Sequence, residues 1–193
     1  MSTPATRSLC DHLAASRRGL ESLTPELARL TRWGRLLRRR LERGNRLLVA
    51  GNGGSAALAH HLVGELVGRY DRERRPFSAL DLSAEPSGLT AIGNDYGYDE
   101  VFARQVVAHG RPGDVLVLLS TSGRSSNLLR AAAEARSAGM VTWAMTGPTP
   151  NPLADAVDDV LVANCPGTPN VQDVQQVAVH LLCLAFELAG RRP

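Results

Sequence analysis

The chain has 193 residues and no lysine, so each of its 22 basic residues is an arginine. This absence excludes a Schiff base between a substrate carbonyl and a lysine of the chain. Any chemistry on a carbonyl carbon therefore has to use another kind of group.

Cysteine and long apolar runs are also scarce. The three cysteines, Cys10, Cys165 and Cys183, are widely spaced and form no CxxC pair, which suits a reducing compartment and structural thiols better than a disulfide framework. No stretch reaches the roughly 18 apolar residues of a membrane span, and the first residues lack the apolar centre of a signal peptide. We expect a cytoplasmic protein with no membrane partner.

The charge of the chain is small and dispersed. The formal net charge is +3, and the basic run from Arg38 to Arg40 is typical of the solvated face of a helix. This pattern argues against a nucleic-acid partner. Hydrophobic residues make up 44% of the chain, enough for one substantial core, and we expect residues 1–193 to form a single domain.

Helical and strand patterns alternate along the chain. Residues 1–45 predict a pair of helices, the second capped at Thr24 and running toward Leu41. The stretch at 83–100 is expected to be irregular. Strands are expected at 47–50, 77–82, 114–119, 140–146 and 158–163. Helices are expected after the first strand and its glycines, ending at about residue 68, and at 101–107, 125–138 and 171–189, with a short element at 151–157. The alternation predicts an α/β fold, a three-layer sandwich around a mostly parallel five-stranded sheet with an N-terminal helical extension.

Two turns of small residues, GNGGS at 51–55 and STSGRSSN at 120–127, each follow a buried strand and open a helix. Such helix N-termini offer unpaired N–H groups to a ligand at the carboxyl ends of parallel strands. Either turn alone is explained as well by capping, but two together favour a phosphorylated small molecule. Neither has the spacing of a nucleotide-binding motif. The hydroxyls that could wrap a phosphate belong to Ser55, Ser120, Thr121, Ser122 and Ser125.

A second candidate group contains two imidazoles, a carboxylate and an amide. His61 and Glu65 are four residues apart and project from one face of a helix. Gln172 and His180 are eight residues apart on the last expected helix. The set could hold a zinc-type ion, or Glu65 and His180 could act as base and acid without a metal. Taken singly, each residue is better explained as an ordinary helix position. The other histidines, His12, His60 and His109, are interpreted as structural.

Five separated blocks carry a resemblance to a known family: GNGGS, then His61 and Glu65 with GRY at 68–70, GNDYG at 93–97, STSGRS at 120–125, and VQDVQQVAVH ending at His180. Together they resemble the sugar isomerase (SIS) domain family and, within it, the phosphoheptose isomerases, also called sedoheptulose 7-phosphate isomerases. The similarity runs from about residue 30 to the C-terminus.

The resemblance implies a homotetramer with active sites between subunits, acting on a phosphorylated seven-carbon sugar. It would interconvert sedoheptulose 7-phosphate and D-glycero-D-manno-heptose 7-phosphate. Glu65 and His180 would be the acid/base pair, and one zinc ion per subunit would be held by His61, Glu65, Gln172 and His180. The substrate-binding residues implied are Asn52, Gly53, Gly54, Ser55, Glu65, Asn94, Asp95, Ser120, Thr121, Ser122, Ser125 and Gln172.

Two residues depart from the family pattern. Arg124 stands where asparagine is common, and it either adds a phosphate contact or points to solvent. Pro169 stands where an acidic residue is frequent, so the loop before the last helix is expected to differ in shape.

Two other functions are open at this point. A relative of the family is a non-enzymatic tetramer that binds the bacterial replication initiator; it lacks the complete acid/base set, so Glu65 with His180 favours the enzyme. A phosphosugar-sensing domain of a transcription regulator would need a DNA-binding segment, and residues 1–45 contain no convincing recognition helix.

Overall fold

Five strands form one sheet in the order β2-β1-β3-β4-β5 in the computed structural model, which describes residues 3–190. Every neighbouring pair is parallel; Leu47, for example, pairs with Ala79 on one side and with Val115 on the other. The strands are β1 (Leu47–Gly51), β2 (Ala79–Asp81), β3 (Val115–Ser120), β4 (Val141–Thr146) and β5 (Asp159–Val162). The predicted α/β class is confirmed, and the sheet is parallel throughout.

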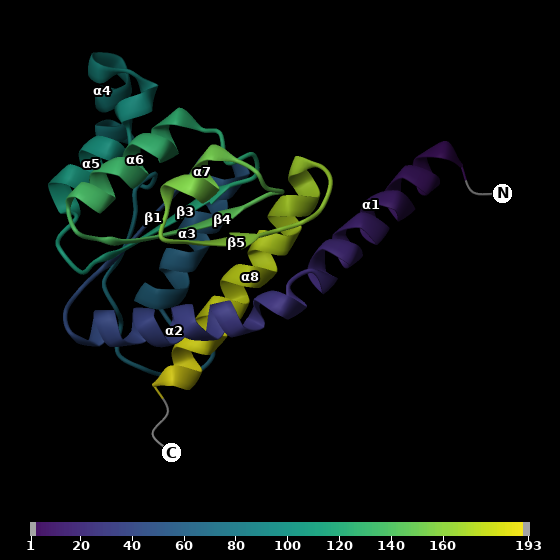
Figure 1. Cartoon of the computed structure of the whole chain (residues 1–193), viewed down its shortest axis with the longest axis horizontal. Helices are drawn as coiled ribbons and strands as arrows, with labels where there is room; N and C mark the ends of the chain where they lie inside the picture. The colour runs from purple at the N-terminus through teal and green to yellow at the C-terminus, as the bar shows by residue number, and fades with distance from the viewer. Residues whose placement is uncertain (1–2, 191–193) are drawn as a thin grey trace.

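Helices cover both faces of this sheet (Figure 1). On one face, α2 (Leu27–Glu42), α3 (Gly54–Val67) and α8 (Thr168–Ala189) bury a core that includes Leu37, Leu62 and Leu182. On the other face, α5 (Ala103–His109), α6 (Ser126–Ser137) and the short α7 (Pro152–Ala156) bury a second core around Phe102 and Leu128. Because both faces are covered, the central strands β1 and β3 are buried along their whole length, as their continuous apolar sequence predicts.

The N-terminal helix α1 (Pro4–Glu21) contacts the body of the protein from His12 onward. Ala15 and Gly19 are buried there, whereas Leu9 and Leu13 are each 68% exposed. Figure 1 shows the first half of α1 extending away from the sheet. No helix within residues 3–190 is both long and apolar enough to cross a membrane.

The start of α2 differs from the expectation of a cap at Thr24. Residues Thr24–Glu26 form a separate 3-10 turn, and α2 begins at Leu27 without a side-chain cap. Pro25 fits the first turn of either helix type, so the pattern of Thr-Pro-Glu alone does not decide between them.

The stretch at 83–100 was expected to be irregular, and this was wrong: it contains α4 (Pro86–Tyr96) and a 3-10 turn (Tyr98–Glu100). The Glu85 carboxylate caps α4 by accepting hydrogen bonds from the amides of Gly88 and Ser87, which hold the pKa of Glu85 below its usual range. The glycines within α4 disfavour a helix by their intrinsic propensity. The cap at Glu85 and the packing of Leu89 and Ile92 against the second core offset that cost.

The last helix begins at Thr168, three residues earlier than expected, so Pro169 lies inside its first turn. Proline is tolerated there because the first amides of a helix have no partner within it. Pro169, which differs from the acidic residue frequent in the family pattern, therefore shapes the start of α8 and not a loop before it.

Candidate active site

The first small-residue turn joins β1 to α3 and places two glycines close to the start of α3. Gly53 has a φ of +55°, a conformation that other residues rarely adopt. A Cβ on Gly54 would lie 2.4 Å from the side-chain nitrogen of Gln172, so a larger residue there would displace the Gln172 side chain. The N-terminus of α3 is thus placed against the first turns of α8.

The second small-residue turn joins β3 to α6. Ser120 Oγ accepts a hydrogen bond from the Gly123 amide at 3.0 Å, and Ser122 Oγ accepts one from the Arg124 amide at 3.2 Å. A hydroxyl can accept and donate at the same time, so both hydroxyls keep an O–H group for a ligand.

Both turns open onto one cavity of about 310 Å³ at the carboxyl edge of the sheet. Because α3 and α6 begin here, their free amides and dipoles favour an anion. Nine of the twelve predicted substrate-binding residues line it, namely Asn52, Gly53, Gly54, Ser55, Ser120, Thr121, Ser122, Ser125 and Gln172, together with Leu119 and Thr168. The two turns, far apart in sequence, thus form one concave, hydroxyl-rich surface, the serine-lined cavity.

A residue that the sequence did not single out, Asn127, ties the two turns together. Asn52 Nδ2 donates to Asn127 Oδ1 at 2.9 Å, and Asn127 Nδ2 donates back to Asn52 Oδ1 at 3.0 Å. The Tyr98 hydroxyl donates to the same Asn52 oxygen at 3.0 Å. Asn52 therefore holds the shape of the cavity through its own side-chain amide.

Asn94 and Asp95 lie in the last turn of α4 and are exposed. The Asn94 amide donates to Asp95 Oδ1 at 2.8 Å, and the lining of the cavity described above does not include either residue. Arg124 is also exposed and is not part of that lining.

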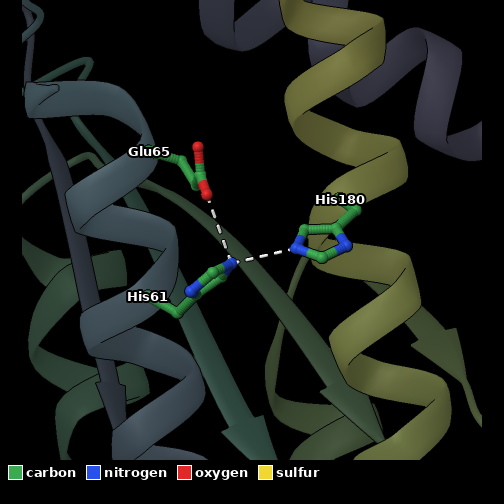
Figure 2. A group of neighbouring side chains, drawn as sticks. All are labelled: His61, Glu65 and His180. Carbon is green, nitrogen blue, oxygen red and sulfur yellow. Dashed lines mark hydrogen bonds and ion pairs between the residues drawn. The ribbon is translucent and has the colours of Figure 1, made fainter. Parts of the chain in front are cut away.

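A second group of side chains lies between α3 and α8 (Figure 2). His61 Nε2 is 3.3 Å from Glu65 Oε1 and 2.9 Å from His180 Nε2. The Glu65 side chain is 19% exposed and that of His61 39% exposed, so the group faces a surface that a ligand can reach. One ligand atom from each of the three residues lies within 4.8 Å of the others, which suits a metal ion.

The hydrogen-bond partners of this group distinguish its two imidazoles. Gln176 Nε2 lies 3.1 Å from His180 Nε2, and an amide nitrogen can only donate. The Glu65 carboxylate can only accept, so the tautomer that satisfies these contacts has a proton on His61 Nε2 and none on His180 Nε2. In that form His180 Nε2 can take up a proton or bind a metal.

The two glutamines of α8 occupy different places. Gln172, the predicted metal ligand, contacts Gly54 at the serine-lined cavity, whereas Gln176 contacts His180. Residues four apart stay on nearly the same face of a helix, and residues eight apart drift further around it. Sequence reasoning missed Gln176, although its spacing of four from His180 was the available signal.

Tyr70 was part of the GRY block but had no predicted role. Its ring centroid lies 5.9 Å from that of His180, and burial, with smaller contributions from Cys183 and Glu65, raises the pKa of Tyr70.

Burial also raises the pKa of Cys183 to about 12, so this thiol is protonated and unreactive near neutral pH.

The remaining histidines lie outside the His61, Glu65 and His180 group. His60 Nδ1 is 3.2 Å from Asp81 Oδ2, and His12 Nε2 is 3.4 Å from Asp173 Oδ2. His109 is the last residue of α5.

Known proteins are similar to this chain in sequence and in fold. Residues 11–147 match the SIS domain. A phosphoheptose isomerase from Streptomyces coelicolor is 60% identical over 83% of this chain and 70% of its own length, and one from a Bradyrhizobium species is 42% identical over 98% and 97%. The structure of a phosphoheptose isomerase from Francisella tularensis superposes with a TM-score of 0.89 at 30% identity, covering 96% of this chain and all of that one.

The parallel sheet, the serine-lined cavity and these matches define the class: a sugar-phosphate isomerase built on an SIS domain. Within that class, the chain belongs to the phosphoheptose isomerase family.

Proposed function

We propose that the chain converts sedoheptulose 7-phosphate to D-glycero-D-manno-heptose 7-phosphate. The single observation that carries this proposal is the meeting of His61 and Glu65 on α3 with His180 on α8, because both helices begin at the serine-lined cavity. These two helices thus join an acid/base group to an anion site. The names of the relatives support an isomerase of a seven-carbon sugar phosphate.

The conversion of a ketose to an aldose requires one proton to move between two carbons and another between two oxygens. Glu65 would remove the proton from C1, leaving an enediolate, and return it to C2. His180, with Nε2 as an acceptor in that tautomer, would carry the proton from the C1 oxygen to the C2 oxygen. C2 is reduced and C1 is oxidised within the one molecule, so no external electron carrier is needed.

The phosphate would bind at the N-termini of α3 and α6 in the cavity of the two turns. With no lysine in the chain, backbone amides and serine hydroxyls are the donors that this cavity provides.

The serine hydroxyls can be tested with a double variant, Ser122→Ala with Ser125→Ala. We expect KM for the phosphorylated sugar to rise by at least about tenfold, since a hydrogen bond to a charged group contributes about 1.5–3 kcal/mol. Ser126→Ala is the matched control, because Ser126 donates to Asp99 and does not line the cavity. An equal rise in KM for the phosphorylated sugar and for the unphosphorylated ketose would show that the turn has only a structural role.

We propose a zinc site at His61, Glu65 and His180, with the Gln172 amide as the fourth ligand once its side chain turns from Gly54 toward the ion. The first three offer two nitrogens and one carboxylate oxygen close together, a donor set that zinc accepts. A bound zinc ion would supply Lewis-acid stabilisation of the enediolate oxygen. A histidine nitrogen that binds a metal cannot also carry a proton, so the proton transfer proposed for His180 applies to the metal-free protein.

We propose a homotetramer with active sites between subunits. Leu27, Leu184 and Leu188 line a groove between α2 and α8 and are 46%, 37% and 46% exposed. Because α8 also carries His180, a second copy seated in this groove would lie close to the acid/base group.

Leu188→Arg should break this assembly by placing a charge in the groove, and we expect a lower molar mass by light scattering at micromolar concentration together with lost activity. Val107→Arg is the control, since Val107 is 63% exposed on α5 across the sheet. A monomeric parent protein that remains active would contradict the proposal.

We propose a cytoplasmic location, which the three free cysteines support because free thiols suit a reducing compartment. The alternative function, binding of a replication initiator by a non-enzymatic tetramer, has no support from the relatives reported above, which carry an isomerase name.

The direct test of the proposed reaction is to incubate the purified protein with sedoheptulose 7-phosphate and follow the product by NMR. We expect the C1 proton of an aldose to appear, and solvent deuterium to enter at C2 in heavy water. A protein that binds the sugar phosphate without forming aldose would contradict the isomerase mechanism at these residues.

A further inference from the structure

The C-terminal end of α3 is closed by the side chain of Arg74, which follows the helix by seven residues. The last carbonyl groups of a helix have no partner within it and need an external donor. Arg74 Nη2 donates to the backbone oxygen of Glu65 at 2.6 Å, and Arg74 Nη1 donates to those of Leu66 at 3.0 Å and Gly68 at 3.3 Å. One guanidinium therefore holds the last turn of α3, including the backbone of Glu65.

Arg74 is in turn held from α8 by Glu187. Arg74 Nε lies 3.5 Å from Glu187 Oε1, and the two side chains are only 11% and 7% exposed. The Arg74 guanidinium also lies 5.4 Å from the ring centroid of Phe77 and 5.8 Å from that of Phe186. A buried ion pair that loses one partner leaves an uncompensated charge, so each partner constrains the other.

The pair spans the two helices that bring the acid/base group together. Glu65 belongs to α3, and Glu187 follows His180 by seven residues on α8, about two turns further on. The distance between the Glu65 carboxylate and the His180 imidazole depends on how these two helices are placed relative to each other. Arg74 and Glu187 join them at the end nearest to Glu65.

We propose that Arg74 and Glu187 are positioning residues for the isomerisation, acting through the backbone of Glu65 and not through the substrate. This inference rests on the proposed roles of Glu65 and His180. A misplacement of about 1 Å in a catalytic group can cost about 10²-fold in rate. The guanidinium is specific to this task, because its planar, fixed set of donors reaches several carbonyls at once, which the single ammonium group of lysine cannot do.

Arg74→Lys tests the proposal while keeping the charge beside Glu187. We expect kcat to fall by about tenfold to 10²-fold, with KM changed by less than about threefold because the phosphate cavity lies at the other end of α3. Arg38→Lys is the matched control. The Arg38 guanidinium lies over the same two rings at 4.9 and 5.2 Å, its side chain is 17% exposed, and it pairs with Glu42 on its own helix.

Amide hydrogen exchange supplies a second measurement that needs no substrate. The Gly68 amide donates to the Gly64 oxygen at 2.8 Å, and the Phe77 amide donates to the Leu66 oxygen at 3.1 Å. Both amides should exchange at least about tenfold faster in Arg74→Lys and at the parent rate in Arg38→Lys.

Unchanged exchange in Arg74→Lys, or equal losses of kcat in the two arginine variants, would overturn the positioning role. Absence of turnover in the parent protein would instead reject the proposed function, and the exchange measurement would still decide whether Arg74 holds the end of α3.

Discussion

Glu65→Gln is expected to lower kcat for the isomerisation by about 10² to 10⁴-fold, the usual contribution of a general base. The amide has almost the same shape as the carboxylate, so it fits the place beside His61, but it cannot accept the proton from C1. Folding should be preserved, with an unchanged circular dichroism spectrum and oligomeric state. The measurement is single-turnover conversion of sedoheptulose 7-phosphate followed by NMR.

Glu73→Gln is the control for this experiment, because Glu73 is an exposed carboxylate that lies beyond the end of α3. It should leave kcat unchanged. If Glu65→Gln keeps activity within about tenfold of the parent, Glu65 is not the base, and the carbon proton has to be moved by another residue.

Removal of a bound metal is expected to have the second largest effect. If zinc stabilises the enediolate oxygen, a chelator should lower kcat by at least about tenfold and added zinc should restore it. His61→Ala should reproduce the chelated state, because His61 has no proton-transfer role in the proposed mechanism. Zinc affinity measured by calorimetry, without substrate, should fall in the same variant.

His60→Ala is the matched control, since His60 is the neighbouring residue on α3 but contacts Asp81. Zinc binding and kcat should both remain at parent values. If His61→Ala and the chelated protein both keep full turnover, Glu65 and His180 act as a metal-free acid/base pair, and His61 is only a neighbour of Glu65.

Several features of the protein were determined locally by the sequence. The nearly continuous apolar runs in β1 and β3 predicted strands buried on both faces, and the glycine and serine turns that follow them predicted an anion cavity. These signals are local because side-chain spacing within one strand, turn or helix follows from the backbone geometry of that element. The spacing of four between His61 and Glu65 placed them on one face for the same reason.

Local signals were weaker where packing outweighed propensity. The stretch at 83–100 contains glycines and was expected to be irregular, yet it forms α4, because Glu85 caps it and its apolar residues pack against the second core. Thr24 was expected to cap α2 and instead begins a 3-10 turn.

Only the tertiary structure decided which residues from different elements meet. His61 and His180 are 119 residues apart, and their contact depends on the packing of α3 against α8, which no spacing within either helix specifies. The same packing placed Gln176 beside His180 and Gln172 at the cavity, and it brought Arg74 and Glu187 together at the end of α3. The sequence by itself determined the fold class, the turns and the i, i+4 pair, because these depend on local backbone geometry. The arrangement of His61, Glu65 and His180 depended on how whole helices pack.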